Sequence, residues 1–271
     1  MAKFHGMGRG SWLACAVVVM LLPGLALAAD RQRKLKAGEY NPADETVEMF
    51  QAMQAGDIEV KLIPKDSTEA RVFIENKTKR PLNVKLPDAF AGVPVLAQIG
   101  GLDPGGGIGG RGGRDRGAGG AQPMGGGMMG GMGGMGMGMG GMMNVAPEKV
   151  GNLKVATVCL AHGKPEPRPK IPYEIKPIDE FTDNVEIQAI CRMVGAGEVN
   201  QRAAQVAAWH YTDGMRWQEL AAKQLRSANG TSRPYFTPEE IKVGMRIAET
   251  ATRLAQESKK KSEKTGSLSQ P

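Results

Sequence analysis

The sequence predicts an α+β protein, in which an antiparallel, sandwich-like β domain precedes a small helical subdomain. Apolar and polar residues alternate with a period of two over residues 57–86, which is typical of strands with one buried face. After residue 178, apolar residues recur every three or four positions, which is typical of amphipathic helices. Between these patterns, residues 100–141 contain 23 of the 38 glycines. This glycine-rich stretch predicts a long insertion within the β domain.

The first 28 residues resemble a secretory signal peptide in their composition. Lys3 and Arg9 precede an apolar run over residues 12–27, and Ala-Leu-Ala at 26–28 matches the small residues of a cleavage site. We therefore expect a mature chain that starts at Ala29 and is secreted, periplasmic or held in the cell envelope. An uncleaved membrane anchor is the alternative.

Composition and periodicity divide the rest of the chain into further segments. They are a disordered lead-in (29–42), a short helix (43–56), the sandwich-like domain (57–99 and 144–177), a disordered Gly/Met-rich insertion (100–143), the helical subdomain (178–257) and a disordered basic tail (258–271). The insertion contains almost no β-branched or aromatic residue, so it has little apolar surface to bury. We expect it to be one oversized connection between two strands, which costs about 2 kcal/mol of loop-closure free energy.

The strands and helices have recognisable boundaries. Turn residues separate alternating runs at 57–64, 69–76 and 81–87, Pro94 marks a fourth run at 89–99 as an edge strand, and alternation resumes within 144–160. Four helices follow: one from Thr182 or Asp183 to Gly195, one capped by Asn200, one over 215–230, and one that starts at the capping box of residues 237–240 and runs to about Glu257.

Catalytic motifs are missing from the sequence. It has no Gly-x-Ser-x-Gly elbow, no His-Glu-x-x-His, no phosphate loop and no dinucleotide fingerprint, so we do not expect an enzyme. Removal of Lys3 and Arg9 lowers the formal charge from +7 to +5. The excess is partly concentrated in residues 111–116 and 258–264, which lack aromatics, so we expect no nucleic-acid partner.

Cys159 and Cys191 are the two cysteines that follow the signal peptide. In an exported protein they are candidates for one disulfide, and two reduced cysteines in the core are the alternative. A zinc site formed by both cysteines with His162 and His210 is a further alternative, although only the Cys-x-x-His spacing supports it.

Methionine is concentrated in the insertion, where nine of the 17 methionines lie between residues 124 and 143. Thioethers are soft ligands that favour Cu(I). Met132, Met135, Met137 and Met139 have the close spacing of a copper(I) site. A low-complexity segment without any metal is the alternative, and no other cofactor is expected.

Residues 150–225 resemble the thioester domains of bacterial surface adhesins. The resemblance rests on Cys159-Leu160 and on the Gln-x-Ala-x-Trp pattern from Gln205 to Trp209. Ala204 stands where that pattern has threonine. The resemblance implies a thioester between the Cys159 thiol and the Gln205 carboxamide, shielded by Trp209, which would capture an amine on a surface partner.

We therefore expect an exported, non-catalytic structural or binding protein whose ligand the sequence does not identify. Its partner would be a surface protein or polymer, and no transmembrane segment is expected after signal cleavage. The first alternative is a covalent module based on Cys159 and Gln205. The second is a Cu(I)-binding protein that uses the Met-rich insertion.

Overall fold

The computed structural model describes residues 38–95, 120–128, 141–227 and 229–267, with side chains as far as Lys261. The expected signal peptide and most of the lead-in lie outside these residues. The described residues belong to the unit Leu35–Pro271. They confirm a mixed α+β fold with mostly antiparallel strands.

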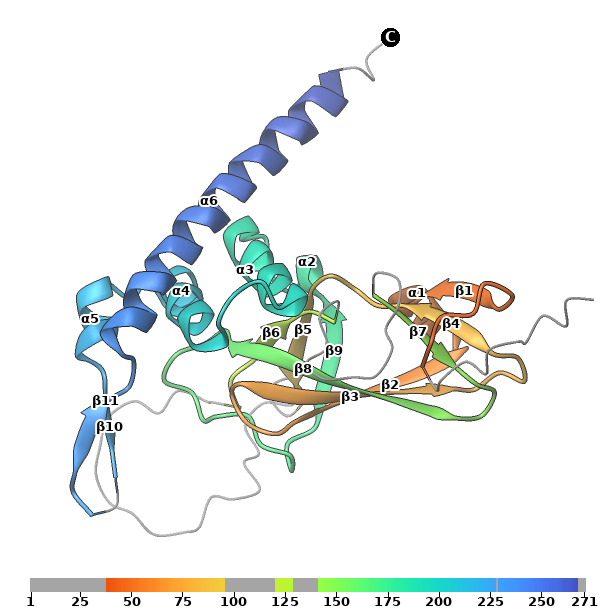
Figure 1. The fold of residues 1–271 in the computed structure, drawn as a ribbon, viewed down its shortest axis with the longest axis horizontal. Coiled ribbons are helices and arrows are strands. Elements are labelled where there is room, and N and C mark those ends of the chain that lie inside the picture. Colours follow the sequence, from red (N-terminus) through yellow and green to blue (C-terminus); the bar gives the residue numbers. More distant parts are fainter. Residues whose placement is uncertain (1–37, 96–119, 129–140, 228, 268–271) are drawn as a thin grey trace, which may run out of the picture. The chain divides into compact units, whose positions relative to one another are not determined.

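Six strands form a closed barrel in the order β2-β3-β8-β6-β5-β9 (Figure 1). Their bounds are β2 Ile58–Pro64, β3 Glu69–Asn76, β5 Phe90–Pro94, β6 Met124–Gly126, β8 Val150–Cys159 and β9 Tyr173–Pro177. Every neighbouring pair is antiparallel. The prediction of a sandwich was wrong because β6 comes from the insertion that was expected to be disordered, and β9 comes from residues 173–177, for which no strand was predicted. By pairing with β5, these two strands join the sheet edges into a barrel.

A smaller sheet of three strands, β1-β4-β7, lies beside the barrel. Its strands are β1 Glu45–Glu48, β4 Leu82–Lys85 and β7 Met142–Val145, and helix α1, Met49–Ala55, follows β1 directly. The buried side chain of Asn83 donates to the carbonyls of Asn41 and Asp44. Residues 45–48 are a strand, because they pair with β4 in parallel, and not the start of the predicted helix 43–56. Gly38 forms an isolated bridge with Asn144, although a disordered lead-in was predicted.

Both described ends of the Gly/Met-rich insertion are ordered parts of the fold. Met124 and Met128 are fully buried, and β6 pairs with β5 and β8. A Cβ on Gly125 would overlap the Cys191 sulfur, and one on Gly195 would overlap the backbone of Gly127. Methionine therefore supplies apolar burial here, while glycine lets α3 approach the strand closely. The prediction that 100–143 forms one disordered connection was wrong for 120–128 and 141–143.

The helices follow β9 in the order α2 Ile178–Phe181, α3 Val185–Ala196, α4 Gln201–Asp213, α5 Trp217–Ala222 and α6 Pro238–Ser267, with the hairpin β10 Gln224–Arg226 and β11 Ser232–Pro234 before α6. Asn200 caps α4 as predicted. Asn184, and not Thr182 or Asp183, caps α3, because its side-chain oxygen accepts from the Ile187 N–H.

The capping box at the start of α6 is confirmed. The Thr237 N–H donates to Glu240 over 2.8 Å, and the Glu240 N–H donates to the Thr237 hydroxyl over 3.1 Å. The helix continues to Ser267, past the predicted end at Glu257 and into the expected tail. The predicted helix 215–230 was wrong beyond Ala222, where the chain turns into the β10–β11 hairpin.

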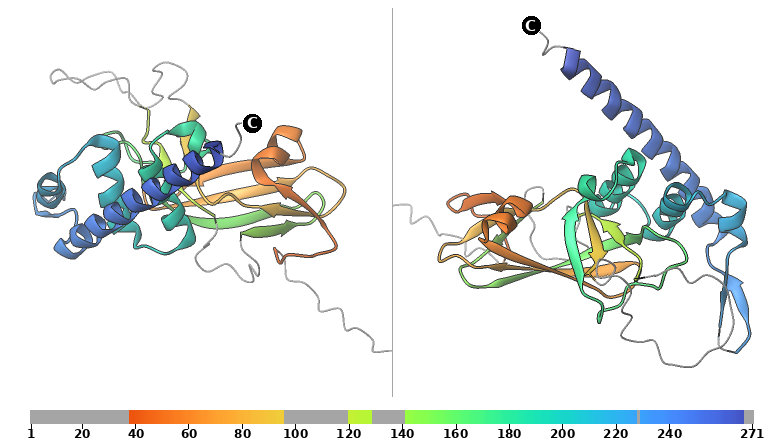
Figure 2. Two further views of the ribbon diagram at one scale, coloured as in Figure 1. Left: turned by 90° about the horizontal axis from the view of Figure 1, so that it is seen from above. Right: turned by 180° about the vertical axis from the view of Figure 1, so that it is seen from behind.

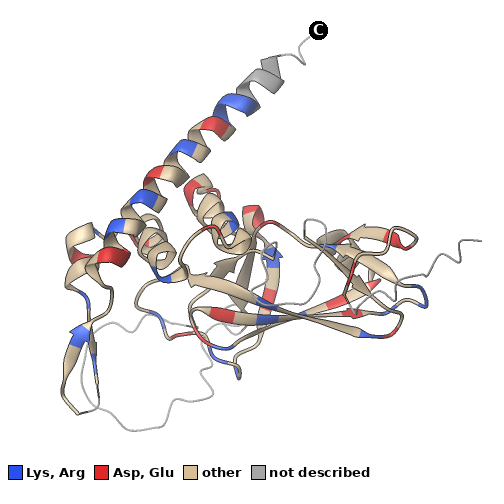
Figure 3. Cartoon of the chain, in the orientation of Figure 1, with Lys and Arg blue, Asp and Glu red and all other residues tan. Residues whose placement is uncertain are grey.

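Helices α3, α4 and α6 pack against one another, and α3 and α4 also contact β8 (Figure 2). Their apolar residues share one cluster with Ala91 of β5 and Val158 of β8. The helices of the expected helical subdomain thus share part of their core with the barrel. Basic and acidic residues are interspersed along α6 (Figure 3).

Candidate functional site

One end of the barrel brings together the residues that the sequence marks as chemically distinctive. Strand β8 ends there at Cys159, where the antiparallel order also places the end of β2 and the starts of β3 and β9. An apolar cluster of Cys159, Val206, Trp209, Leu220, Phe236 and Ile241 joins this end to the helices. The candidate site lies on this cluster.

Cys159 and Gln205 are in direct contact, but through the backbone of Cys159. The Cys159 N–H donates to Gln205 Oε1 over 2.7 Å, and Gln205 Nε2 donates to the Cys159 carbonyl over 2.9 Å. Strand β3 starts at Glu69, opposite Ala156, so it supplies no partner to Cys159. The Gln205 amide takes the place of a neighbouring strand. We call this pair of hydrogen bonds the Gln205 clamp.

The Cys159 thiol is directed to a different neighbour. Its sulfur lies 3.9 Å from the carbonyl oxygen of Ser67, in the turn between β2 and β3. Burial, together with the smaller effect of the charges of Glu166 and Asp66, raises the pKa of this thiol to about 12. Because a thiol is nucleophilic only as its thiolate, Cys159 is a poor nucleophile in this arrangement.

Cys191 does not meet Cys159. Both cysteines are free thiols in the structure, and Cys191 lies on α3 in a different apolar cluster, beside Gly125. Burial raises its pKa to about 12 as well. The structure therefore shows the reduced core cysteines of the alternative and does not form the predicted disulfide, because the two side chains face different layers of the core.

The metal predictions have different outcomes. Among the described residues, no group of three or more His, Cys, Asp or Glu side chains could hold a metal ion, so the zinc set is not assembled. His162 Nε2 contacts Lys223 Nζ, and His210 stacks on Trp217 with Nδ1 against the Met215 carbonyl. Met132, Met135, Met137 and Met139 lie outside the described residues, so the Cu(I) site stays a prediction.

Four residues near Cys159 form a group that we call the lysine cluster: His162, Trp209, Lys223 and Tyr235. Lys223 Nζ lies 2.7 Å from His162 Nε2, 5.3 Å from the centre of the Trp209 ring and 5.1 Å from that of Tyr235. The His162 ring meets Trp209 edge to face at 4.8 Å. The Lys223 ammonium is thus held between two aromatic faces and an imidazole nitrogen.

The electrostatics of the cluster reflect partial burial. Burial lowers the pKa of Lys223, against the opposing charge of Glu166. Burial also lowers the pKa of His162, aided by Lys223 and opposed by Asp213. Because an ammonium only donates, His162 Nε2 accepts and its ring proton is on Nδ1. Among the ion pairs between described residues, none includes Lys223.

Arg202 is the second cation near Tyr235, and two of its three side-chain nitrogens are already engaged. Its Nε donates to Glu240 over 2.6 Å, and its Nη2 donates to the Tyr235 carbonyl. The guanidinium also lies 5.5 Å from the ring centres of Tyr235 and Phe236. Arg202 of α4 thereby links the Tyr235 backbone to Glu240 of α6, whereas Lys223 forms no ion pair among the described residues.

Sequence patterns did not reveal the lysine cluster. His162 drew attention only as a zinc ligand, Trp209 only as a shield, and Lys223 and Tyr235 belong to no motif. These residues come from the segment after β8, from α4, from the residue after α5 and from the residue after β11. Only the tertiary fold brings them together, so no local signal was available.

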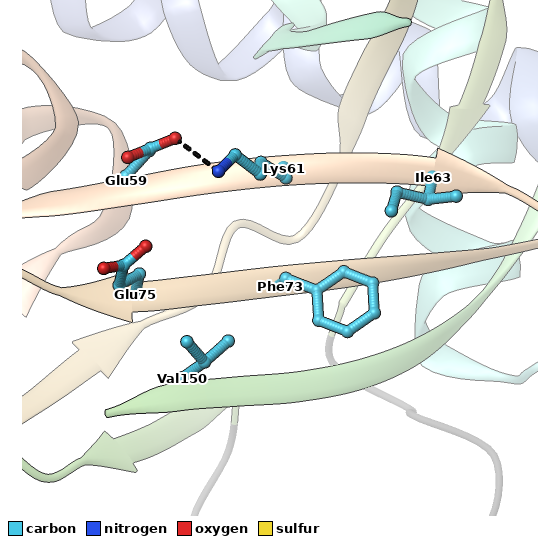
Figure 4. Close-up of a pocket in the computed structure, with 6 residues that line it drawn as sticks. All are labelled: Glu59, Lys61, Ile63, Phe73, Glu75 and Val150. Carbon is cyan, nitrogen blue, oxygen red and sulfur yellow. Dashed lines mark ion pairs between the residues drawn. The ribbon is translucent and has the colours of Figure 1, made fainter. Parts of the chain in front are cut away.

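A shallow hollow on the outer wall of the barrel is a separate surface feature (Figure 4). It has a volume of about 230 Å³ and is lined by Glu59, Lys61, Ile63, Phe73, Glu75 and Val150. Ile63 is 41% exposed and Val150 is 55% exposed. Lys61 and Lys77 both pair with Glu59 beside it, so ion pairs border an apolar strip.

No helix of the described residues is long and apolar enough to cross a membrane. The assignment of the site depends on the geometry above, because comparisons of the chain with protein-family models, curated proteins and solved structures found no match.

Proposed function

We propose that the protein is an exported, non-catalytic binding protein that acts in the periplasm or at the cell surface. The observation that carries this proposal is the half-buried Lys223 ammonium, which is held against His162, Trp209 and Tyr235 without an acidic partner among the described residues. A positioned cation that forms no ion pair with the described residues favours a role in binding an external group.

The surroundings of the cluster support a rigid binding surface more than a reaction centre. The nearest thiol, that of Cys159, is protonated at neutral pH because of its raised pKa. The Gln205 amide is fully engaged by the backbone of Cys159. Both features support a structural role for the residues beneath Lys223.

A binding experiment on envelope material tests this proposal. Purified protein without the signal peptide is incubated with washed envelope fractions of the source organism, and the retained amount is measured. We expect Lys223→Met to reduce retention, while Lys242→Met, a change at an exposed lysine of α6, leaves it unchanged. Equal retention of all three proteins contradicts a binding role for the cluster.

A thioester module is the second candidate, and the contact between Cys159 and Gln205 is the observation that favours it. In that reaction the Cys159 sulfur bonds to the Gln205 side-chain carbonyl carbon, the C–N bond breaks, and ammonia leaves with the thiol proton. An amine on a partner would then displace the thiol and form an amide.

Intact mass separates the two candidates. The thioester requires a loss of about 17 Da, and methylamine must replace the lost ammonia and restore one free thiol. A non-covalent binding protein instead has the full mass of a chain starting at Ala29, and Cys159 and Cys191 both react with a thiol reagent after denaturation. The full mass with two free thiols rules out the thioester.

A further inference from the structure

We infer that the lysine cluster is a binding site for one organic carboxylate, presented by an acidic sugar or by a peptide. This inference rests on the proposed binding function and names the ligand class. It follows from the hydrogen-bonding capacity of Lys223, from the charge at the site and from the ring beside it.

The first step is the number of free donors. An ammonium has three N–H donors. One of those on Lys223 is directed to His162 Nε2, the hydrogen-bond partner of Nζ among the described residues. Two donors are left for an external acceptor. A carboxylate offers two oxygens with several acceptor positions, so it can take both.

The second step is the charge that the ligand must carry. Lys223 is half-buried, and the nearby guanidinium of Arg202 is already committed to Glu240 and to the Tyr235 carbonyl. Lys223 thus carries a positive charge in partly desolvated surroundings, where the charge of Glu166 acts on it but no ion pair forms among the described residues. One carboxylate neutralises this positive charge, whereas a phosphate carries more negative charge than one lysine balances.

The third step concerns the aromatic ring beside the Lys223 ammonium. The Tyr235 ring is only partly buried, and Lys223 Nζ lies 5.1 Å from its centre. Trp209 is 3% exposed, so it packs against Lys223 from the protein interior and offers a ligand almost no surface. A ligand whose carboxylate reaches Lys223 can place a sugar ring or an apolar side chain on Tyr235.

Proton and carbon NMR of the two histidines provides the test. Protein labelled at His162 and His210 is titrated at neutral pH with glucuronate, with N-acetylphenylalanine and with inorganic phosphate. We expect the His162 ring signals to move saturably with at least one carboxylate and His210 to serve as the internal reference. Lys223→Met should weaken that binding by about tenfold or more, since a charge-assisted hydrogen bond is lost.

The outcomes distinguish an acidic sugar from a peptide, and they distinguish a wrong ligand class from a wrong function. Saturation by glucuronate alone identifies an acidic sugar, and saturation by N-acetylphenylalanine alone identifies a peptide. Binding that survives in a folded Lys223→Met protein, tighter binding of phosphate, or no saturation by either carboxylate overturns the inference. If Lys223-dependent envelope retention persists while both carboxylates fail, only the ligand class is wrong. If neither carboxylate binds and envelope retention does not depend on Lys223, the proposed function is wrong as well.

Discussion

Strand β3 starts at Glu69 and therefore does not pair with Cys159. The side chain of Gln205 instead makes the two hydrogen bonds to the Cys159 backbone that a neighbouring strand would make. The sequence pattern predicted that Cys159 and Gln205 would meet, and the structure brings them together. It could not predict that the contact would use the backbone of Cys159. That detail depends on where β3 begins, which is set by the turn held by Asp66 and Thr68.

Gln205→Leu is the sharpest test of the clamp. It keeps the size of the side chain but leaves a buried N–H and a buried carbonyl unpaired, so we expect a loss of about 2–4 kcal/mol of unfolding free energy. Urea denaturation measures it, with Gln218→Leu on the exposed face of α5 as the control. A loss as small as that of the control would show that water replaces the clamp.

His162 gives the protein a pH-dependent stability. Its pKa in the folded state is lowered from 6.5, mainly by burial, so the unfolded chain binds the proton more readily. The stability that comes from the neutral ring is present above pH 6.5 and is lost as the pH falls through the lower folded value. We expect urea midpoints to drop between pH 7 and pH 5, and to drop less for His162→Gln. If the urea midpoint of His162→Gln drops as much as that of the unchanged protein, the pH dependence comes from another group. His210→Gln is the matched control.

At the scale of elements, local signals predicted the starts of α4 and α6 well, because a cap is satisfied within a few residues. Strand β1 was missed because its partner, β4, lies far along the chain. Strand β6 was missed because a Met-Gly-Gly sequence carries no strand signal of its own. Both strands exist through tertiary pairing.

The capping box of α6 has a measurable effect on stability. Thr237→Ala removes the hydroxyl that accepts from the Glu240 N–H, and we expect a loss of about 1 kcal/mol. Thr250→Ala, in the interior of the same helix, is the control and should be neutral or slightly stabilising, because alanine is the better helix former. Thermal unfolding of both variants measures the difference. An equal effect of the two would show that the cap contributes nothing.

At the scale of the whole molecule, the Gly/Met-rich segment combines two roles that composition alone could not separate. Met124 and Met128 are core residues of the barrel, although their neighbours in sequence resemble a simple repeat. Composition reports a shortage of bulky side chains over the whole segment. It does not report that a few positions are buried by strands from elsewhere in the chain.

This distinction changes how the Cu(I) hypothesis is tested. Deletion of residues 124–143 would remove β6 and part of β7, so we expect an unfolded protein whose lost copper uptake means nothing. Replacement of Met132, Met135, Met137 and Met139 by leucine removes the thioethers and leaves the buried methionines intact. If the hypothesis is right, this variant keeps its circular dichroism spectrum and loses Cu(I) in a competition titration. Unchanged Cu(I) uptake would exclude these four residues.

The closure of the barrel also determines where the native protein opens. Strands β2 and β3 pair over seven residues, but β2 and β9 pair only at Leu62 and Tyr173. Few backbone hydrogen bonds must break to separate that seam, so local unfolding should begin there. We expect amide hydrogens of β9 to exchange faster than those of β3 under native conditions. Equal protection of both strands, measured by mass spectrometry of exchanged peptides, would show that side-chain packing compensates for the short seam.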